Sequence, residues 1–182
     1  MNEDESHTEN NPPVSTGGGD DGTTTLLGSG RMPKDDLRIA VLGDVDEASS
    51  FLGLARAETD DEELGAVLIE MQRLLYRVMG DVAMPREDNF VGGQDLASVD
   101  EALKGWRDRT GLPTEFVVPG ETRLGALLDV SRSVVRRAER SLVAAGYPAE
   151  HPYAVRAINR LSDLLYILAR NADGENRLSK GS

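Results

Sequence analysis

A chain of 182 residues is long enough to bury one proper core, and its length fits one domain rather than two. It has no cysteine, which excludes a disulfide framework, a thiolate nucleophile and a cysteine zinc site, and two distant histidines, His7 and His151, predict no metal site. The net charge of −12 argues against a nucleic-acid or anionic-membrane partner. Because no apolar run is long enough to cross a bilayer and the N-terminus is acidic and polar, we expect a cytoplasmic protein.

The charged residues have an unusual balance. Arginine outnumbers lysine by 17 to 3, and 32 carboxylates accompany few aromatic residues. Such a composition resembles that of proteins from salt-accumulating archaea. Ordinary acidic solubility explains it equally well.

The N-terminal part has two predicted segments. Residues 1–15 are polar and contain two prolines, which predicts a disordered acidic tail. Residues 16–35 are rich in glycine and predict a phosphate-binding loop, in which successive N–H groups form a concave surface for phosphate and Lys34 adds a charge. The alternative is a flexible linker.

Two better-known phosphate motifs do not fit this loop. Gly17, Gly19 and Gly22 satisfy G-x-G-x-x-G, but a polar tail stands where the dinucleotide fold requires a buried strand. The spacing also approaches that of a P-loop, yet Thr23 stands where the lysine should be. Both motifs are therefore excluded.

Residues 36–173 show helical apolar periodicity. The clearest seam is Leu64, Leu68, Met71, Leu75, Val78 and Val82, and similar seams span 124–142 and 161–168. With helices expected at 39–57 and 96–109, the pattern predicts an all-α fold, a five-helix antiparallel bundle, followed by a flexible C-terminus at 174–182.

Arginines cluster on the helix expected at 124–142. Arg132, Arg136 and Arg140 recur every four residues and form one stripe, whereas Arg137 points away from it. Guanidinium groups match the paired oxygens of phosphates and carboxylates, so the stripe predicts an anion site. A solvated charged face with local pairs to Glu139 is the alternative.

Other residues carry weaker signals. Asp46 and Glu47 on the first helix, and Asn159 on the last, are either hydrogen-bonded groups of an interface or core, or ordinary caps and surface groups. Phe116, beside Pro119 and Gly120, is by default a core aromatic that anchors its loop.

Together these segments resemble the ATP:cob(I)alamin adenosyltransferase family of the propanediol-utilisation (PduO) type. Six of its motifs occur in order over residues 16–173. They are T-x-x-G-D-x-G-x-T at Thr16–Thr24, K-x-D at Lys34–Asp36, G-x-x-D-E at Gly43–Glu47, F-x-x-P-G at Phe116–Gly120, R-x-x-x-R-R-A-E-R at Arg132–Arg140 and N-R-L-S-D at Asn159–Asp163. Departures include Glu121 for a common glycine and Asp129 for a common histidine.

The resemblance implies a homotrimer that binds ATP at its subunit contacts. One subunit would supply Thr16, Gly17, Gly18, Gly19, Asp20, Gly22, Thr24, Thr25 and Lys34, and its neighbour Arg136, Arg137, Glu139, Arg140 and Asn159. It further implies that Asp46 pairs with Arg132 across the interface, and that Phe116 occupies the lower face of the cobalt and makes the metal easier to reduce.

The implied reaction is attack of cob(I)alamin on the 5′ carbon of ATP, which gives adenosylcobalamin and triphosphate. Mg²⁺ would assist, a reductase would supply the electron, and an adenosylcobalamin-dependent enzyme would accept the product. Two alternatives remain: a protein that binds ATP or delivers adenosylcobalamin with little turnover, and a helical interaction module without a ligand.

Overall fold

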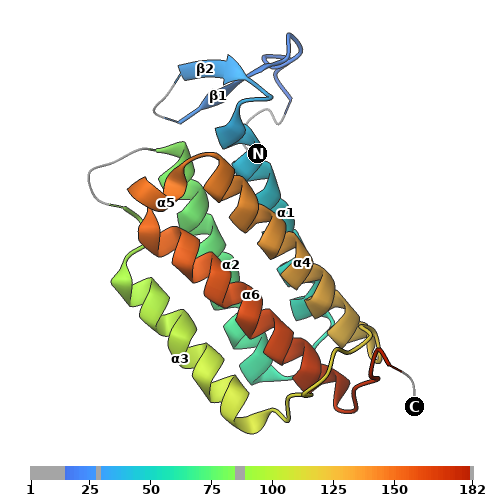
Figure 1. Ribbon diagram of the computed structural model, residues 1–182. Helices are drawn as coiled ribbons and strands as arrows, with labels where there is room; N and C mark the ends of the chain where they lie inside the picture. The colour runs from blue at the N-terminus through green and yellow to red at the C-terminus, as the bar shows by residue number, and fades with distance from the viewer. Residues whose placement is uncertain (1–14, 28–29, 85–88, 181–182) are drawn as a thin grey trace, which may run out of the picture.

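In the part of the chain that the structure describes, five long helices and one short helix form a bundle, and a small hairpin precedes them (Figure 1). The computed structural model describes residues 15–27, 30–84 and 89–180, so residues 1–14 of the expected acidic tail lie outside it. In these ranges the elements are β1 (Thr23–Leu26), β2 (Gly30–Pro33), α1 (Leu37–Ala57), α2 (Glu62–Ala83), α3 (Gly93–Arg109), α4 (Arg123–Ala144), α5 (Tyr147–Glu150) and α6 (Pro152–Asp173).

The long helices pack in the order α2, α1, α4, α6, α3. From α2 to α6 each helix is antiparallel to its neighbour, as expected, whereas α3 runs in the same direction as α6 (Figure 1). The ion pair between Arg160 on α6 and Asp100 on α3 (3.2 Å) agrees with this direction, because both residues lie in the first half of their helices. The helix order places the arginine-rich α4 between α1 and α6.

The predicted apolar seams form the core. All six residues of the 64–82 seam are buried, and so are the leucines of 161–168. Each buried aliphatic side chain contributes about 1.5–3 kcal/mol relative to an exposed one. In the described residues, no helix is both long and apolar enough to cross a membrane.

Besides the parallel packing of α3 on α6, two details of the predicted fold differ from the structure. The segment expected to be a loop contains the antiparallel pair β1 and β2, in which Thr24 lies opposite Met32. The described residues also contain a sixth helix, the four-residue α5. Both elements are too short to show the sustained periodicity on which the prediction depended.

Side-chain caps define where three of the helices begin. Asp36 accepts a hydrogen bond from the N–H of Arg38 (2.9 Å), and Asp61 accepts one from the N–H of Glu63 (2.9 Å). At the start of α4 the hydroxyl of Thr122 accepts from the N–H of Gly125 (2.9 Å). These bonds satisfy backbone donors that have no partner inside the helix.

Gly125 allows α4 to approach the end of α6. A Cβ atom at this position would lie 1.9 Å from Oδ1 of Asp173, so a larger residue forces the two elements apart. We expect Gly125→Ala to destabilise the protein by about 1–3 kcal/mol and lower the melting temperature by about 3–10 °C. Thermal unfolding followed by circular dichroism measures this. Gly105→Ala is the control, since a Cβ on Gly105 meets nothing within 4 Å; an equal loss in both variants would contradict the packing explanation.

Candidate functional site

Three adjoining cavities follow α4 and share lining residues. The first has a volume of about 400 Å³ and the second about 320 Å³, and both are lined by Arg132 and Tyr166. The third, of about 290 Å³, shares Arg136 with the second. The three cavities therefore lie in a row, which we call the trough, from the loop of Phe116 to Arg140 and Asn159.

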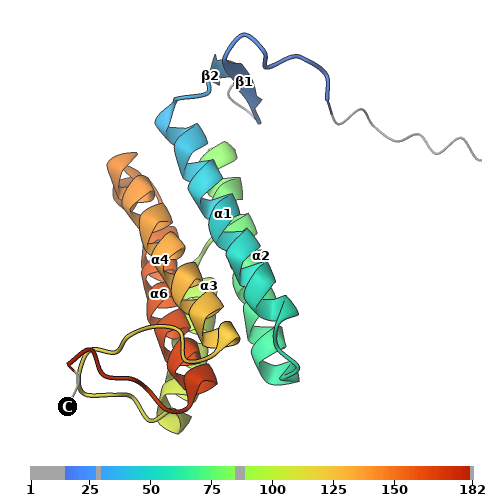
Figure 2. The ribbon, with the colours of Figure 1, turned by 90° about the vertical axis from the view of Figure 1, so that its right-hand side faces the viewer.

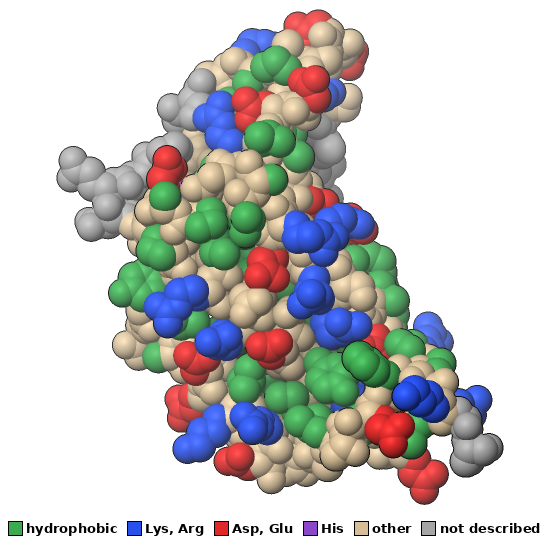
Figure 3. Space-filling view, in the orientation of Figure 1, with side chains coloured by type: hydrophobic (Ala, Val, Ile, Leu, Met, Phe, Trp, Pro, Cys, Tyr) green, Lys and Arg blue, Asp and Glu red, His purple; other side chains and the backbone are tan. Residues whose placement is uncertain are grey.

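The predicted arginine stripe lines this trough. Arg136 and Arg140 border the third cavity together with Glu139, Val143 and Asn159. The amide of Asn159 donates a hydrogen bond to Glu139 (2.9 Å), which joins α6 to α4. Across the described residues, no carboxylate forms an ion pair with Arg136 or Arg140, while basic side chains gather over α4 (Figure 3). Two unneutralised guanidinium groups in an acidic protein favour the anion-site interpretation over a face of local pairs.

Arg137 does not join that stripe, as its position on the helix predicted. It donates to Asp44 (3.0 Å) and forms a second ion pair with Glu47, both on α1. Ser141 also donates to Asp44. In this structure Arg137 therefore ties α4 to α1 and lines none of the three cavities.

The glycine-rich segment forms two successive turns before β1. Gly17 (φ 67°) and Gly22 (φ 79°) have left-handed backbones that favour glycine. Arg31 donates to the carbonyl of Gly18 (2.8 Å) and pairs with Asp21. Hydrogen bonds from Thr23, with Arg31 nearby, lower the pKa of Asp21 below its ordinary value. The carboxylate that braces the turns therefore stays ionised at neutral pH.

The amino group of Lys34 lies against these turns. A Cβ on Gly19 would lie 3.1 Å from Nζ of Lys34 and 3.1 Å from the carbonyl oxygen of Thr23. The predicted cluster of glycines, threonines and one lysine is thus brought together in a single exposed hairpin, which also carries Thr16, Asp20, Thr24 and Thr25.

We expect Gly19→Ala to weaken ATP binding by about tenfold, because the added methyl group displaces the Lys34 amine from the turns. Isothermal titration calorimetry measures the change. Gly65→Ala on α2 is the matched control, since its Cβ meets nothing within 4 Å. Unchanged ATP affinity in Gly19→Ala would show that this position does not shape the nucleotide site.

The two predicted halves of the nucleotide site lie apart within one chain. The hairpin extends beyond one end of the bundle (Figures 1 and 2), whereas the trough is lined by residues of α4 and α6. In the ranges that the structure describes, no hydrogen bond or ion pair joins residues 16–35 to either of these helices. The described contacts of one chain therefore do not join the two halves.

Phe116 was wrongly expected to be a core aromatic by default. Its side chain is 86% exposed and borders the first cavity, opposite Arg132 and Asp129 on α4. Arg132 pairs with Asp129 (3.4 Å) in this chain. Asp46 is exposed on α1, and no described residue forms a hydrogen bond or ion pair with it. That leaves Asp46 free for a contact outside the chain.

Several residues of this region were missed by sequence reasoning. Tyr166 lines two of the cavities, and Arg107 lines the second. Residues 177–179, expected to be part of a flexible end, form backbone hydrogen bonds with the loop of Phe116 (2.8 Å each). Arg177 also pairs with Glu121 (3.0 Å). None of these contacts has a sequence signal, because each depends on how distant segments pack.

Metal binding by the protein alone finds no support in the described residues, where no group of three or more acidic, histidine or cysteine side chains is suitably placed. Mg²⁺ commonly binds one or two carboxylates together with substrate phosphates. Glu139 is the carboxylate that borders the third cavity, so the residues fit a Mg²⁺ ion that arrives on a nucleotide.

Comparison with known proteins identifies the family. Residues 14–172 match the family model described as cobalamin adenosyltransferase. The chain is 37% identical to a corrinoid adenosyltransferase of Citrobacter freundii over 86% of this chain and 93% of that protein. It is 40% identical to one of Mycobacterium bovis, over 89% of this chain and 90% of that protein.

Solved structures agree. A variant PduO-type ATP:corrinoid adenosyltransferase from Lactobacillus reuteri, complexed with cobalamin and ATP, is 28% identical and superposes with a TM-score of 0.82, covering 93% of this chain and 100% of that one. Another variant, complexed with ATP, gives the same TM-score at 29% identity, with 92% and 100% covered. The chain therefore belongs to the PduO-type cobalamin adenosyltransferase family.

Proposed function

We propose that this protein transfers the 5′-deoxyadenosyl group of ATP to cob(I)alamin and releases triphosphate. The observation that carries the proposal is the third cavity, where Arg136, Arg140, Glu139 and Asn159 converge and two guanidinium groups have no carboxylate ion pair among the described residues. ATP supplies the negative charge that such a cavity requires. The first cavity, bordered by the exposed Phe116, receives the flat face of the corrin.

The proposed step is a direct displacement. Cob(I)alamin donates an electron pair to C5′ of ATP, the cobalt–carbon bond forms, and the C5′–oxygen bond breaks with its electrons leaving on triphosphate. Cobalt is the nucleophile, so the chain needs no Ser, Cys or His triad. Its residues align the two substrates, neutralise the leaving group through arginines, Lys34 and nucleotide-bound Mg²⁺, and exclude water.

Oligomerisation completes the proposed site. In a homotrimer, the hairpin with Lys34 would close over the third cavity of a neighbour, and the exposed Asp46 would meet Arg132 of another subunit. The absence of any bond between the hairpin and α4 or α6 within the described part of one chain supports this arrangement.

Mixed trimers test the shared site. Lys34→Ala and Arg136→Ala are each expected to lose activity by on the order of 100-fold, yet co-expression with two different tags should restore activity. In every trimer that carries both tags, one of the three sites pairs an intact hairpin with an intact α4 from different subunits, so we expect roughly a third of the wild-type rate. Light scattering checks the oligomeric state. Complete inactivity of the doubly tagged trimers would indicate that one subunit supplies both halves.

A second candidate function is binding or delivery without turnover, because such a protein requires the same site. An anaerobic assay with ATP, Mg²⁺ and reduced cobalamin, followed by the corrin spectrum, separates the two. We expect adenosylcobalamin to form, and at molar KCl as well as at low salt, given the acidic composition. ATP binding without any product at either salt concentration would favour the delivery protein.

The cellular setting remains a prediction. We place the reaction in the cytoplasm, with a reductase that supplies cob(I)alamin and an adenosylcobalamin-dependent enzyme that accepts the product. Cob(I)alamin is readily oxidised, so direct handover from a reductase would protect it.

A further inference from the structure

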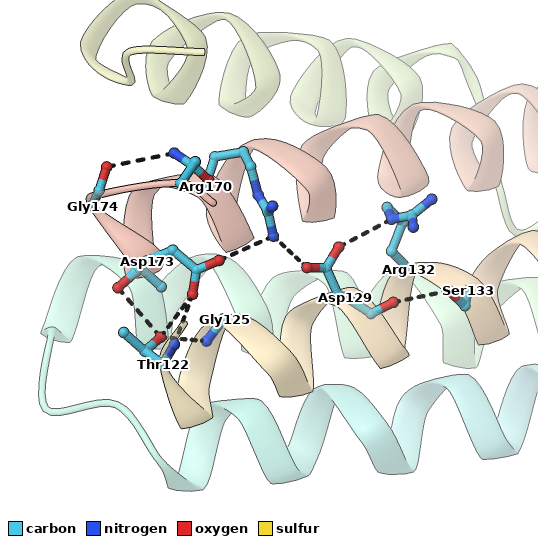
Figure 4. A network of polar contacts seen from close by, with 10 residues as sticks. Thr122, Gly125, Asp129, Arg132, Ser133, Arg170, Asp173 and Gly174 are labelled. Atoms are coloured by element: carbon cyan, nitrogen blue, oxygen red, sulfur yellow. Dashed lines mark hydrogen bonds and ion pairs between the residues drawn. The ribbon is translucent and has the colours of Figure 1, made fainter. Parts of the chain in front are cut away.

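A buried arginine at the end of α6 holds a group of polar contacts that the proposed reaction does not use directly (Figure 4). The side chain of Arg170 is 1% exposed and lies between two buried carboxylates. It forms an ion pair with Asp129 on α4 and another with Asp173 in the last turn of α6 (3.1 Å). Burying charged groups carries a large desolvation cost, so such a group is poor evidence for stability and better evidence for fixed geometry.

Asp173 fixes the chain just before α4. Its Oδ1 accepts hydrogen bonds from the backbone N–H of Thr122 (3.0 Å) and from the Thr122 hydroxyl (3.1 Å). Gly125 lies next to Thr122 and Asp173 (Figure 4), and its lack of a side chain leaves room for this carboxylate. The C-terminal end of the loop that carries Phe116 is therefore attached to the end of α6.

The middle of the same loop is attached to the chain that follows Asp173. The N–H of Val118 donates to the carbonyl of Arg177 (2.8 Å), and the N–H of Ser179 donates to the carbonyl of Phe116 (2.8 Å). Only a few residues separate Asp173 from Arg177, so both attachments depend on where α6 ends. A change at Asp173 would move them together.

The opposite wall of the first cavity depends on the same arginine. Asp129 borders that cavity and accepts a hydrogen bond from Nε of Arg132 (3.4 Å) while it pairs with Arg170. Arg170 thus reaches Phe116 through Asp173 on one side, and Arg132 through Asp129 on the other.

We propose that Asp173, held by Arg170, is a positioning residue for the Phe116 loop and sets how that loop meets the corrin. This inference rests on the proposed function for its effect on turnover, but its structural part does not. The polar contacts fix the loop whether or not the chain turns over cobalamin.

Hydrogen exchange tests the structural part without a substrate. In Asp173→Asn we expect amides of residues 116–118 and 177–179 to exchange about tenfold faster, because the charged acceptor for Arg170 is lost. Amides in α1 and α2 should stay unchanged. Asp81→Asn is the matched control, since buried Asp81 accepts N–H bonds from Phe90 and Val91 at the other end of the bundle. Uniformly faster exchange over all helices would show that Asp173 stabilises the whole fold and does not position the loop, which would overturn the proposal.

Cobalamin measurements test the functional part. In Asp173→Asn we expect the KM for cob(I)alamin to rise by about tenfold and the Kd for ATP to change less than about twofold. The electron paramagnetic resonance spectrum of the variant should show less four-coordinate cob(II)alamin than that of the wild type. Faster amide exchange in the loop, together with an unchanged KM for cob(I)alamin and an unchanged spectrum, would overturn the functional part of the proposal. Absence of turnover in the wild type would instead contradict the proposed function and leave the exchange result standing.

A second pair of variants covers the case in which Asp173→Asn does not fold. Thr122→Val removes the hydroxyl that donates to Asp173 and also accepts from the N–H of Gly125, and it should reproduce the faster exchange of the loop and the higher KM for cob(I)alamin. Thr122→Ser keeps the hydroxyl and should behave like the wild type. Equal behaviour of the two variants would overturn the proposal.

Discussion

Replacing Arg136 by alanine should lower kcat/KM for ATP by on the order of 100-fold, which is typical for the loss of one preorganised donor at a developing negative charge. Arg136 borders both the second and the third cavity, and no described carboxylate forms an ion pair with it. Its charge is therefore available for the leaving triphosphate. Steady-state kinetics with ATP and cob(I)alamin measure the effect, and most of the loss should appear in kcat.

Arg73→Ala is the matched control for this prediction. Arg73 is an exposed arginine on α2, it pairs with Glu70 one turn away, and it lines none of the three cavities. We expect its kinetics to match those of the wild type. Similar losses in both variants would indicate a general effect of net charge, and an unaffected Arg136→Ala would remove α4 from the nucleotide site.

Replacing Phe116 by alanine should slow turnover that starts from cob(II)alamin by about 100-fold, equivalent to about 3 kcal/mol. The exposed aromatic ring borders the first cavity, where it can cover the lower face of the corrin and keep water and the lower base from the cobalt. Without the ring the metal would stay five-coordinate and harder to reduce. Parallel assays from cob(II)alamin with a reductant and from cob(I)alamin measure both steps.

The second assay should show a smaller loss, because cob(I)alamin has already passed the reduction step. ATP affinity should not change, since Phe116 does not border the third cavity. Val118→Ala, in the same exposed loop, serves as the control and should retain activity. A Phe116→Ala protein that reduces and adenosylates cob(II)alamin at the wild-type rate would contradict the role of the ring.

The sequence predicted the helices well because their apolar residues repeat over many turns. The seam of Leu68, Leu75 and Val82 is buried as expected. The spacing of Arg132, Arg136 and Arg140 predicted one stripe, and all three border the trough. These outcomes follow from helix geometry alone. The hairpin and α5 were missed because each of their regular elements spans four residues.

Contacts between distant segments were beyond sequence reasoning. Nothing in the spacing indicates that Arg170 meets Asp129, or that residues 177–179 pair with the loop of Phe116. The default burial of Phe116 was wrong, because residue type alone cannot distinguish a core aromatic from one exposed at a cavity. No described contact of one chain joins the hairpin to α4 or Asp46 to Arg132, so their predicted pairing across subunits stays a prediction.

The most direct test of adenosyl transfer is a single-turnover reaction of the purified protein with cob(I)alamin and ATP labelled with ¹³C at C5′. Nuclear magnetic resonance then follows carbon and phosphorus in the same sample. We predict that the label appears in a carbon bonded to cobalt and that one intact triphosphate is released for each adenosylcobalamin formed. Label that stays in ATP or its hydrolysis products, while the protein binds both substrates, would contradict the transferase and favour a binding protein.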